Sequence, residues 1–242
     1  MEAIKTIHLT KRYHDIVAVD DLHLQIGQGE LFSLLGVNGA GKTTAIKMLS
    51  GLTKPTQGDA LIGGHSVTRD AWQVKGIIGV SPQETAVAPN LTVKENLELM
   101  CGIHGYSAGQ TKAKIKALSA EFNLEEILGK RAGKLSGGWQ RRLSIAMALV
   151  NDPKILFLDE PTLGLDVIAR SQLWDTIRAL KGKITIILTT HYMEEAEALS
   201  DRIGIMAKGK LLVTGTAGEL MAQTGEDRFE NAFISIVREG AL

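Results

Sequence analysis

The sequence has 242 residues, and its 27 basic and 27 acidic side chains give a formal net charge of zero. This length predicts one domain, or a domain with an inserted lobe, that can bury a sizeable core. A composition of 44% hydrophobic and 22% charged residues excludes a disordered or fibrous protein. Zero net charge excludes a global field that would attract nucleic acid or anionic lipid, so any anion binding must be local.

The cysteine content and the apolar runs bear on the compartment. A single cysteine, Cys101, excludes an internal disulfide and fits a reducing environment. Because it lies in the apolar stretch "LELMCGI", we expect its side chain to be buried. No apolar run approaches the roughly 18 residues that span a bilayer, and the start "MEAIKTIHLT" lacks the apolar region of a signal peptide. We therefore expect no membrane span, so a protein of this kind would need another chain to cross a membrane.

The first third of the chain favours strands. Apolar segments bounded by glycine or polar residues predict strands at 17–26, 30–36, 59–64 and 76–82. The stretch "TTAIKMLSGL" predicts a helix after the second of these.

The middle of the chain, residues 88–150, is expected to be helical. Thr92 and Glu95 have the spacing of a capping box, and Ser107 can cap the helix that follows it. The basic run "KAKIK" within that helix is typical of a solvated face.

Strand signals return at 154–160 and 184–190. Both runs are short, apolar and rich in β-branched residues, which predicts strands buried on both faces of a parallel sheet. A helix is expected between them at 166–180, and another in the tail at 228–242. Their apolar faces would carry Leu173, Ile177 and Leu180 in the first, and Phe229, Phe233 and Ile236 in the second. The fold class is therefore α/β with an inserted helical lobe.

A phosphate-binding loop is present in "GVNGAGKTT", between a predicted strand and a predicted helix. Gly36, Gly41, Lys42 and Thr43 match G-x-x-x-x-G-K-[ST]. Backbone N–H groups would surround the β-phosphate, Lys42 would place its charge between the β- and γ-phosphates, and the Thr43 hydroxyl would bind Mg²⁺. The residues expected to bind ATP here are Gly36, Val37, Asn38, Gly39, Ala40, Gly41, Lys42, Thr43 and Thr44.

Two carboxylates end the predicted strand "ILFLDE". Asp159 would hold Mg²⁺, which prefers hard oxygen ligands, and Glu160 would accept a proton from the attacking water. The alternative is that both carboxylates only cap the next turn.

A second anion-binding loop occurs far downstream, in "LSGGWQRRL". Ser136, Gly137 and Gly138 stand where a helix would begin, so the first helical N–H groups could receive an anion.

Together these motifs resemble the ATP-binding cassette (ABC) ATPases. The similarity rests on 36–44, Gln83, 135–140, the pair Asp159 and Glu160, "LGLD" at 163–166 and His191, and it covers nearly the whole chain, weakening after about residue 220. It implies a P-loop NTPase (RecA-like) core with an antiparallel β-subdomain and an inserted α-helical subdomain. Residues 1–242 would form one ABC ATPase domain, with the core in 1–87 and 151–220, the helical subdomain in 88–150 and a helical tail in 221–242.

The resemblance also implies why there are two anion loops. Ser136, Gly137 and Gly138 would contact ATP held by a second cassette, so two MgATP would lie in a head-to-tail dimer. A homodimer is expected, with a heterodimer as the alternative. Asp166 would lie at the dimer seam and help to place the opposing catalytic water.

The resemblance assigns roles to further residues, each with a structural alternative. Gln83 would sense Mg²⁺ and water, or else cap a turn. His191 would donate to the γ-phosphate, or be structural. Tyr13 would stack on adenine, or be a surface tyrosine at a strand end. Trp139 replaces the usual Gln and could contact the partner or the ribose, or pack on its own helical lobe.

The resemblance implies the ATPase subunit of a membrane transporter. The stretches "EPTLGLDVIARSQLW" and "GKLLVTGTAGEL" are similar to ATPases of bacterial ABC-2-type exporters of drugs, antibiotics, lipids or ions. A separate permease chain would dock on residues 83–100, which places the protein in the cytoplasm, peripheral on the inner face of the cell membrane. No nucleic-acid partner is expected. The alternatives are a soluble ABC ATPase acting on ribosomes or DNA, and a regulatory cassette.

Overall fold

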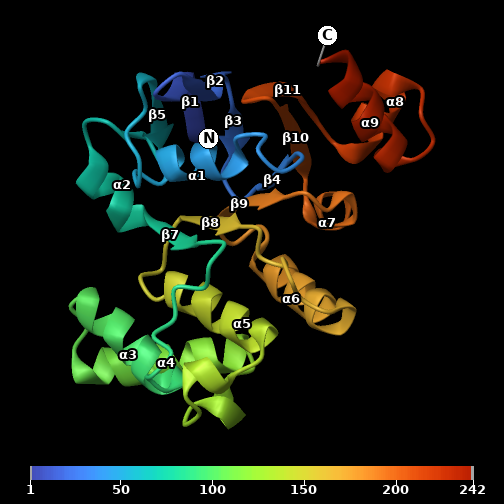
Figure 1. The fold of residues 1–242 in the computed structure, drawn as a ribbon. Coiled ribbons are helices and arrows are strands. Elements are labelled where there is room, and N and C mark those ends of the chain that lie inside the picture. The colour runs from blue at the N-terminus through green and yellow to red at the C-terminus, as the bar shows by residue number, and fades with distance from the viewer. Residues whose placement is uncertain (1, 241–242) are drawn as a thin grey trace.

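The structure is a computed structural model that describes residues 2–240. Figure 1 shows an open arrangement in which helices α3, α4 and α5 gather at one end and the strands β1, β2 and β5 lie at the other. The elements follow in chain order as β1 (Glu2–Tyr13), β2 (Ile16–Leu22), β3 (Gln25–Gly27), β4 (Leu31–Leu35), α1 (Lys42–Leu49), β5 (Gln57–Ile62), β6 (His65–Ser66), α2 (Ala71–Ile77), β7 (Ile78–Ser81), α3 (Val93–Ile103), α4 (Ala108–Glu121), α5 (Gly137–Ala148), β8 (Ile155–Asp159), α6 (Val167–Leu180), β9 (Thr185–Thr190), α7 (Met193–Leu199), β10 (Arg202–Ala207), β11 (Lys210–Gly215), α8 (Ala217–Thr224) and α9 (Phe229–Glu239).

The larger sheet contains the strands that the sequence predicts to be buried. It runs in the order β11-β10-β4-β9-β8-β7, with β11 antiparallel to β10 and the other neighbours parallel. Every residue of β4, β8 and β9 is buried, as strands covered on both faces require. The expected α/β fold with a parallel core sheet is confirmed.

The smaller sheet is antiparallel and is built around β1, which pairs with β2, β3 and β5. The single strand expected at 17–26 is instead two strands, because the chain bends at His23 and Leu24. Buried Thr6 holds this bend: its hydroxyl donates to Leu22 O at 2.7 Å and accepts from Leu24 N at 2.6 Å.

The helical lobe begins with the two predicted caps. Thr92 and Glu95 form a capping box at the start of α3, and Ser107 forms one with Gln110 at the start of α4. Cys101 is fully buried in α3, as its apolar surroundings predict.

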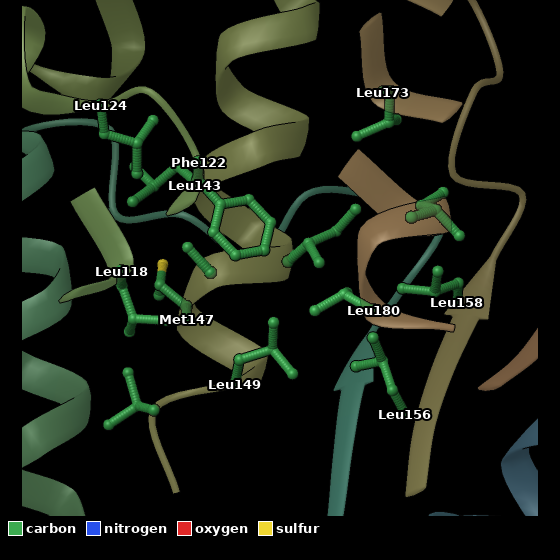
Figure 2. Close-up of a cluster of buried hydrophobic side chains, with 14 of the residues drawn as sticks. Leu118, Phe122, Leu124, Leu143, Met147, Leu149, Leu156, Leu158, Leu173 and Leu180 are labelled. Atoms are coloured by element: carbon green, nitrogen blue, oxygen red, sulfur yellow. The ribbon is translucent and has the colours of Figure 1, made fainter. Parts of the chain in front are cut away.

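A continuous cluster of buried side chains joins this lobe to the larger sheet (Figure 2). It combines Phe122, which follows α4, and Leu143 of α5 with Leu156 and Leu158 of β8. Fully burying one such side chain contributes roughly 1.5–3 kcal/mol. The predicted inner face of α6, Leu173, Ile177 and Leu180, packs into the same cluster.

The tail forms a helical hairpin at the opposite corner of the molecule from the helical lobe (Figure 1). Helix α9 buries Phe229, Phe233 and Ile236, as predicted. Helix α8 begins at Ala217, before the expected tail boundary at 221, because Thr216 caps it. Residues 1, 241 and 242, which the expected ranges include, lie outside the described residues.

None of the helices formed by residues 2–240 combines the length and the apolar character needed to cross a membrane.

Candidate functional site

The predicted catalytic segments meet at one edge of the larger sheet. The phosphate loop follows β4, His191 follows β9, Glu160 follows β8, and Gln83 follows β7. Because β4, β9, β8 and β7 are neighbouring parallel strands, their carboxyl ends lie side by side. They line a cavity of about 630 Å³. The predicted site residues that line it are Asn38, Gly39, Ala40, Gly41, Lys42, Thr43, Thr44, Gln83, Glu160 and His191.

Two glycines of the phosphate loop are required by close backbone approaches. A Cβ at Gly36 would lie 2.4 Å from Met206 O, and a Cβ at Gly41 would lie 2.4 Å from Ala18 O. Gly41 also has φ +102° and caps α1, whose first N–H groups are directed at the loop. This is the backbone arrangement that binds phosphate at a helix N-terminus.

Lys42 is buried beneath the loop, with 4% of its surface exposed. Its Nζ donates to Gly36 O at 2.7 Å and to Val37 O at 3.2 Å, and lies 3.6 Å from Glu160 Oε1. Burial lowers the pKa of the Lys42 ammonium, whereas Glu160 and Asp159 act to raise it. A buried cation that shares its protons with loop carbonyls is well placed to receive phosphate oxygens instead.

Two of the three residues expected at Mg²⁺, Thr43 and Asp159, are in direct contact. Thr43 Oγ1 donates to Asp159 Oδ1 at 3.1 Å, and Thr189 Oγ1 donates to the same oxygen at 2.5 Å. The Asp159 carboxylate is buried at the end of β8. The Thr43 hydroxyl, which lines the cavity, and the buried carboxylate bonded to it fit a small hard cation that keeps several waters.

Glu160 holds its carboxylate between Lys42 and His191. Its φ is +45°, and its N–H donates to Thr189 O at 3.1 Å and to Thr189 Oγ1 at 3.0 Å, which fixes this unusual backbone conformation. Glu160 Oε2 lies 3.3 Å from His191 Nδ1, although the geometry there is not that of a hydrogen bond. Within the described residues neither Asp159 nor Glu160 caps the following turn with its carboxylate, so the capping alternative finds no support.

Gln83 is tied to the helical lobe by a residue that the sequence analysis missed. Arg141 of α5 donates to Pro82 O and to Gln83 O, both at 2.6 Å. Burial lowers the pKa of the Arg141 guanidinium, and Asp159 and Glu195 oppose this. Movement of α5 would therefore pull directly on the Gln83 backbone. The basic pair Arg141 and Arg142, which follows the Ser-Gly-Gly loop after two residues, was the available signal.

The Ser136 loop lies apart from the cavity. A Cβ at Gly137 would lie 3.7 Å from Leu165 Cδ2, and one at Gly138 would lie 3.2 Å from Ala169 Cβ, so the loop packs on the start of α6. Ser136 is exposed, and within the described chain its side chain makes no capping hydrogen bond to α5.

Asp166 lies at this same place. Its Oδ1 accepts from Ala169 N at 2.9 Å and caps α6. The predicted nucleotide-binding residues thus form two separate groups, one around the cavity and one around the Ser136 loop.

Tyr13 belongs to neither group. Its side chain is exposed at the end of β1, with Lys11 Nζ 4.9 Å from its ring centre. The cavity wall on this side is formed by Ile16, Val17 and Ala18 instead. Stacking of Tyr13 on adenine stays a prediction.

Trp139 packs on its own helical lobe. It is partly buried against the cluster of Figure 2, and the Arg142 guanidinium lies 4.7 Å from its ring centre. Within the single chain, the structural alternative for Trp139 therefore holds.

Glu195 is a second residue that the sequence patterns did not single out. It is fully buried in α7, and its Oε1 accepts from Thr162 Oγ1 at 2.8 Å and from Trp174 Nε1 at 2.9 Å. Burial raises the pKa of its carboxyl, although these hydrogen bonds act to lower it. Glu195 thereby joins the helix after His191 to the helix that begins near Asp166.

Comparison with known proteins identifies the family. Residues 19–163 match the family model described as "ABC transporter". This chain belongs to the ABC transporter family. The cassette is 42% identical over 221 residues to the daunorubicin resistance ATP-binding protein DrrA3 of Streptomyces coeruleorubidus, a match that covers 91% of the chain and 70% of that protein. It is 38% identical over 242 residues to the probable multidrug ABC transporter ATP-binding protein YbhF of Escherichia coli, covering 98% of the chain but only 42% of that protein.

Solved structures agree with the fold of the cassette. An ATP-binding subunit of an ABC transporter matches with a TM-score of 0.85 at 27% identity, covering 97% of this chain and 99% of that one. The ATP-binding cassette MJ0796, dimeric in a post-hydrolysis state with ADP and phosphate, matches with a TM-score of 0.79 at 28% identity, covering 88% and 98%. The protein is an ATP-binding ABC ATPase, and hydrolysis of ATP is its chemistry.

Proposed function

We propose that this cassette works as a head-to-tail dimer that closes over two MgATP and drives export through an integral membrane permease on a separate chain. The observation that carries the dimer is the division of the site into two groups. The phosphate loop lines the cavity, whereas the exposed Ser136 loop and Asp166 lie elsewhere on the same chain.

The surface around the Ser136 group supports this pairing. Val167 and Ile168, the first residues of α6, are 77% and 71% exposed. Large apolar side chains exposed beside a polar loop are typical of a protein interface. In the dimer, Ser136 and the N–H groups of Gly137 and Gly138 would contact the γ-phosphate held by the partner cassette.

Within each closed site, the cavity residues would divide the work of hydrolysis. Lys42 would exchange its carbonyl partners for phosphate oxygens, Thr43 and Asp159 would hold Mg²⁺, and Gln83 would contact its water shell. Mg²⁺ would neutralise charge on the transferred phosphoryl group. Glu160 would take the proton of the attacking water, and His191 would donate to the γ-phosphate.

Hydrolysis would then open the closed dimer. Loss of the γ-phosphate removes the anion that both cassettes share, so the closed interface loses its central contact. Arg141 would couple this opening to the helical lobe, because its guanidinium on α5 donates hydrogen bonds to Pro82 O and Gln83 O.

Export through a permease is supported by the names of the relatives. DrrA3 is a daunorubicin resistance protein and YbhF is named as a multidrug transporter component. On this chain, residues 83–100 and the exposed Leu99 of α3 would receive a cytoplasmic helix of the permease. The cassette would then lie in the cytoplasm on the inner face of the membrane, as a homodimer or with a second cassette. No relative reported above is named for ribosomes or DNA, so the soluble alternative has no support of its own.

The shared site can be tested by mixing two inactive variants. Lys42→Ala disables the cavity and Ser136→Arg blocks the loop, so a mixed dimer keeps one site in which both halves are intact. We expect ATPase activity to reappear on mixing. A protein with both substitutions, mixed with Lys42→Ala, is the matched control and should stay inactive. Failure of the mixture, when each variant binds its partner, would show that Ser136 acts within its own chain.

The export proposal needs a separate test. The tagged cassette, purified from gently solubilised membranes, should bring down an integral membrane protein with several apolar spans. Recovery of ribosomal proteins in its place would overturn the transporter assignment while leaving the dimer intact.

A further inference from the structure

A group of three side chains outside the nucleotide site has the composition of a metal centre. His8 lies in β1, Asp21 in β2, and His23 in the bend between β2 and β3. One ligand atom from each lies within 4.8 Å of the other two. We propose that His8, Asp21 and His23 bind a divalent transition metal of the zinc class on the outer face of the antiparallel sheet.

The distances are close to those that a bound ion needs. Asp21 Oδ1 lies 2.8 Å from His8 Nδ1 and 3.1 Å from His23 Nε2. With bonds of about 2.0–2.1 Å, two ligand atoms on a tetrahedral Zn²⁺ are about 3.4 Å apart. To reach this separation, Asp21 Oδ1 must move about 0.6 Å further from His8 Nδ1 and about 0.3 Å further from His23 Nε2. Exposed side chains can make such shifts, and the ion then replaces the hydrogen bonds that now join Asp21 to the two histidines.

The sheet holds these side chains in place. Leu9 pairs with Leu22 in the antiparallel register, which sets His8 opposite His23. Their ring centres are 4.4 Å apart with the planes at 85°, an edge-to-face contact, and one nitrogen of each ring lies within hydrogen-bond distance of Asp21 Oδ1. Two ligands thus come from paired strands, and the third comes from the two-residue connection between β2 and β3.

The backbone at two of the ligands is unusual. His8 and Asp21 both have φ +48°, a conformation that costs L-residues energy. The His8 backbone approaches β5 closely at Gly58, where a Cβ would lie 2.0 Å from His8 O. Because glycine has no Cβ, this approach is possible. The sheet therefore keeps an irregular geometry at the point where the three side chains converge.

The ligand set selects the metal class. Two imidazoles and one carboxylate suit Zn²⁺, Cu²⁺ or Ni²⁺, whereas Mg²⁺ prefers oxygen ligands in octahedral geometry. The three side chains are 70%, 58% and 54% exposed for His8, Asp21 and His23, so an ion reaches them from solvent and keeps water at its open position. The site is thus distinct in chemistry from the magnesium site of the cavity.

The test is calorimetric titration of Zn²⁺ into the full chain, freed of metal and held in excess Mg²⁺ without nucleotide. We expect one Zn²⁺ per chain. His8→Ala, His23→Ala and Asp21→Asn should each weaken binding by more than the roughly 10–100-fold that loss of an outer-shell partner costs. Asn suits position 21 because it tolerates positive φ. His104→Ala, which removes an exposed histidine at the end of α3, is the matched control and should bind Zn²⁺ as the unaltered chain does.

Thermal unfolding separates binding from damage to the fold. Without metal, the three variants and the control should melt within a few degrees of the unaltered chain. Zn²⁺ should raise the melting temperature of the unaltered chain and of the control but not of the three variants. The proposal is overturned if the unaltered chain shows no saturable Zn²⁺ binding. It is also overturned if the His8 and His23 variants bind Zn²⁺ as tightly as the unaltered chain does.

Discussion

Glu160→Gln separates nucleotide binding from hydrolysis in the cavity. Gln has the same shape, so the hydrogen bonds from the residue 160 N–H to Thr189 remain. The substitution removes a charge 3.6 Å from Lys42 Nζ. At an effective dielectric constant of about 20, opposite charges at that distance attract by about 4–5 kcal/mol. Without the Glu160 charge, Lys42 keeps its carbonyl partners and the weaker attraction of Asp159, so its ammonium interacts more strongly with phosphate.

ATP affinity should therefore be retained or increased, while hydrolysis falls. Loss of a general base lowers the rate roughly 10²–10⁴-fold, which raises the barrier by about 3–5 kcal/mol. Calorimetry measures the affinity, phosphate release measures the rate, and light scattering should show ATP converting the 26.1 kDa chain to twice that mass. The control is Glu194→Gln, which changes an exposed glutamate three positions after His191. An undiminished rate would refute the role of Glu160, and a monomer at saturating ATP would contradict the shared site.

Lys42→Ala should weaken ATP binding by about 10–100-fold, the value of one or two charged hydrogen bonds, and calorimetry showing unchanged affinity would remove Lys42 from the phosphate site. Ser136→Ala should leave ATP binding to the monomer unchanged and lower the ATPase rate of the dimer by about tenfold. Identical turnover in that variant would argue against contact with the partner's ATP. Glu195→Gln should raise the melting temperature at neutral pH, with a gain that shrinks in acid, whereas Glu194→Gln should show no such trend.

The sign of the Glu195 effect follows from its buried carboxyl. Its pKa is raised above the ordinary value of 4.5, so in the window from 4.5 up to that pKa the folded chain holds more protons than the unfolded chain. The stability contributed by Glu195 is therefore fully present below pH 4.5 and is lost as pH rises through the raised pKa. Gln still accepts from Thr162 and Trp174 but carries no charge, so its advantage should be greatest above that window. A gain independent of pH would show that charge burial is not the cause.

Local sequence signals predicted the elements that carry a clear marker, such as a capping box or an uninterrupted apolar run. The capping boxes at Thr92 and Ser107 formed because both partners lie within one turn, and β8 and β9 are uniformly apolar. Helix α2 was missed because it buries only Val74, so it lacks an apolar stripe. Strand β1 was missed because its buried and exposed residues do not alternate regularly, which reflects its irregular register with β2, β3 and β5.

Residue type and spacing alone indicate the chemistry of the nucleotide site, because the phosphate loop, the carboxylates that end β8 and His191 are recognisable without a structure. Which of them meet was decided by the sheet order, since β9 lies between β4 and β8 although it follows both in the chain. The separation of the Ser136 loop from the cavity, and the contacts of Arg141 and Glu195, are likewise tertiary. They depend on packing between segments far apart in the chain. A local pattern such as the pair Arg141 and Arg142 can mark such residues but cannot name their partners.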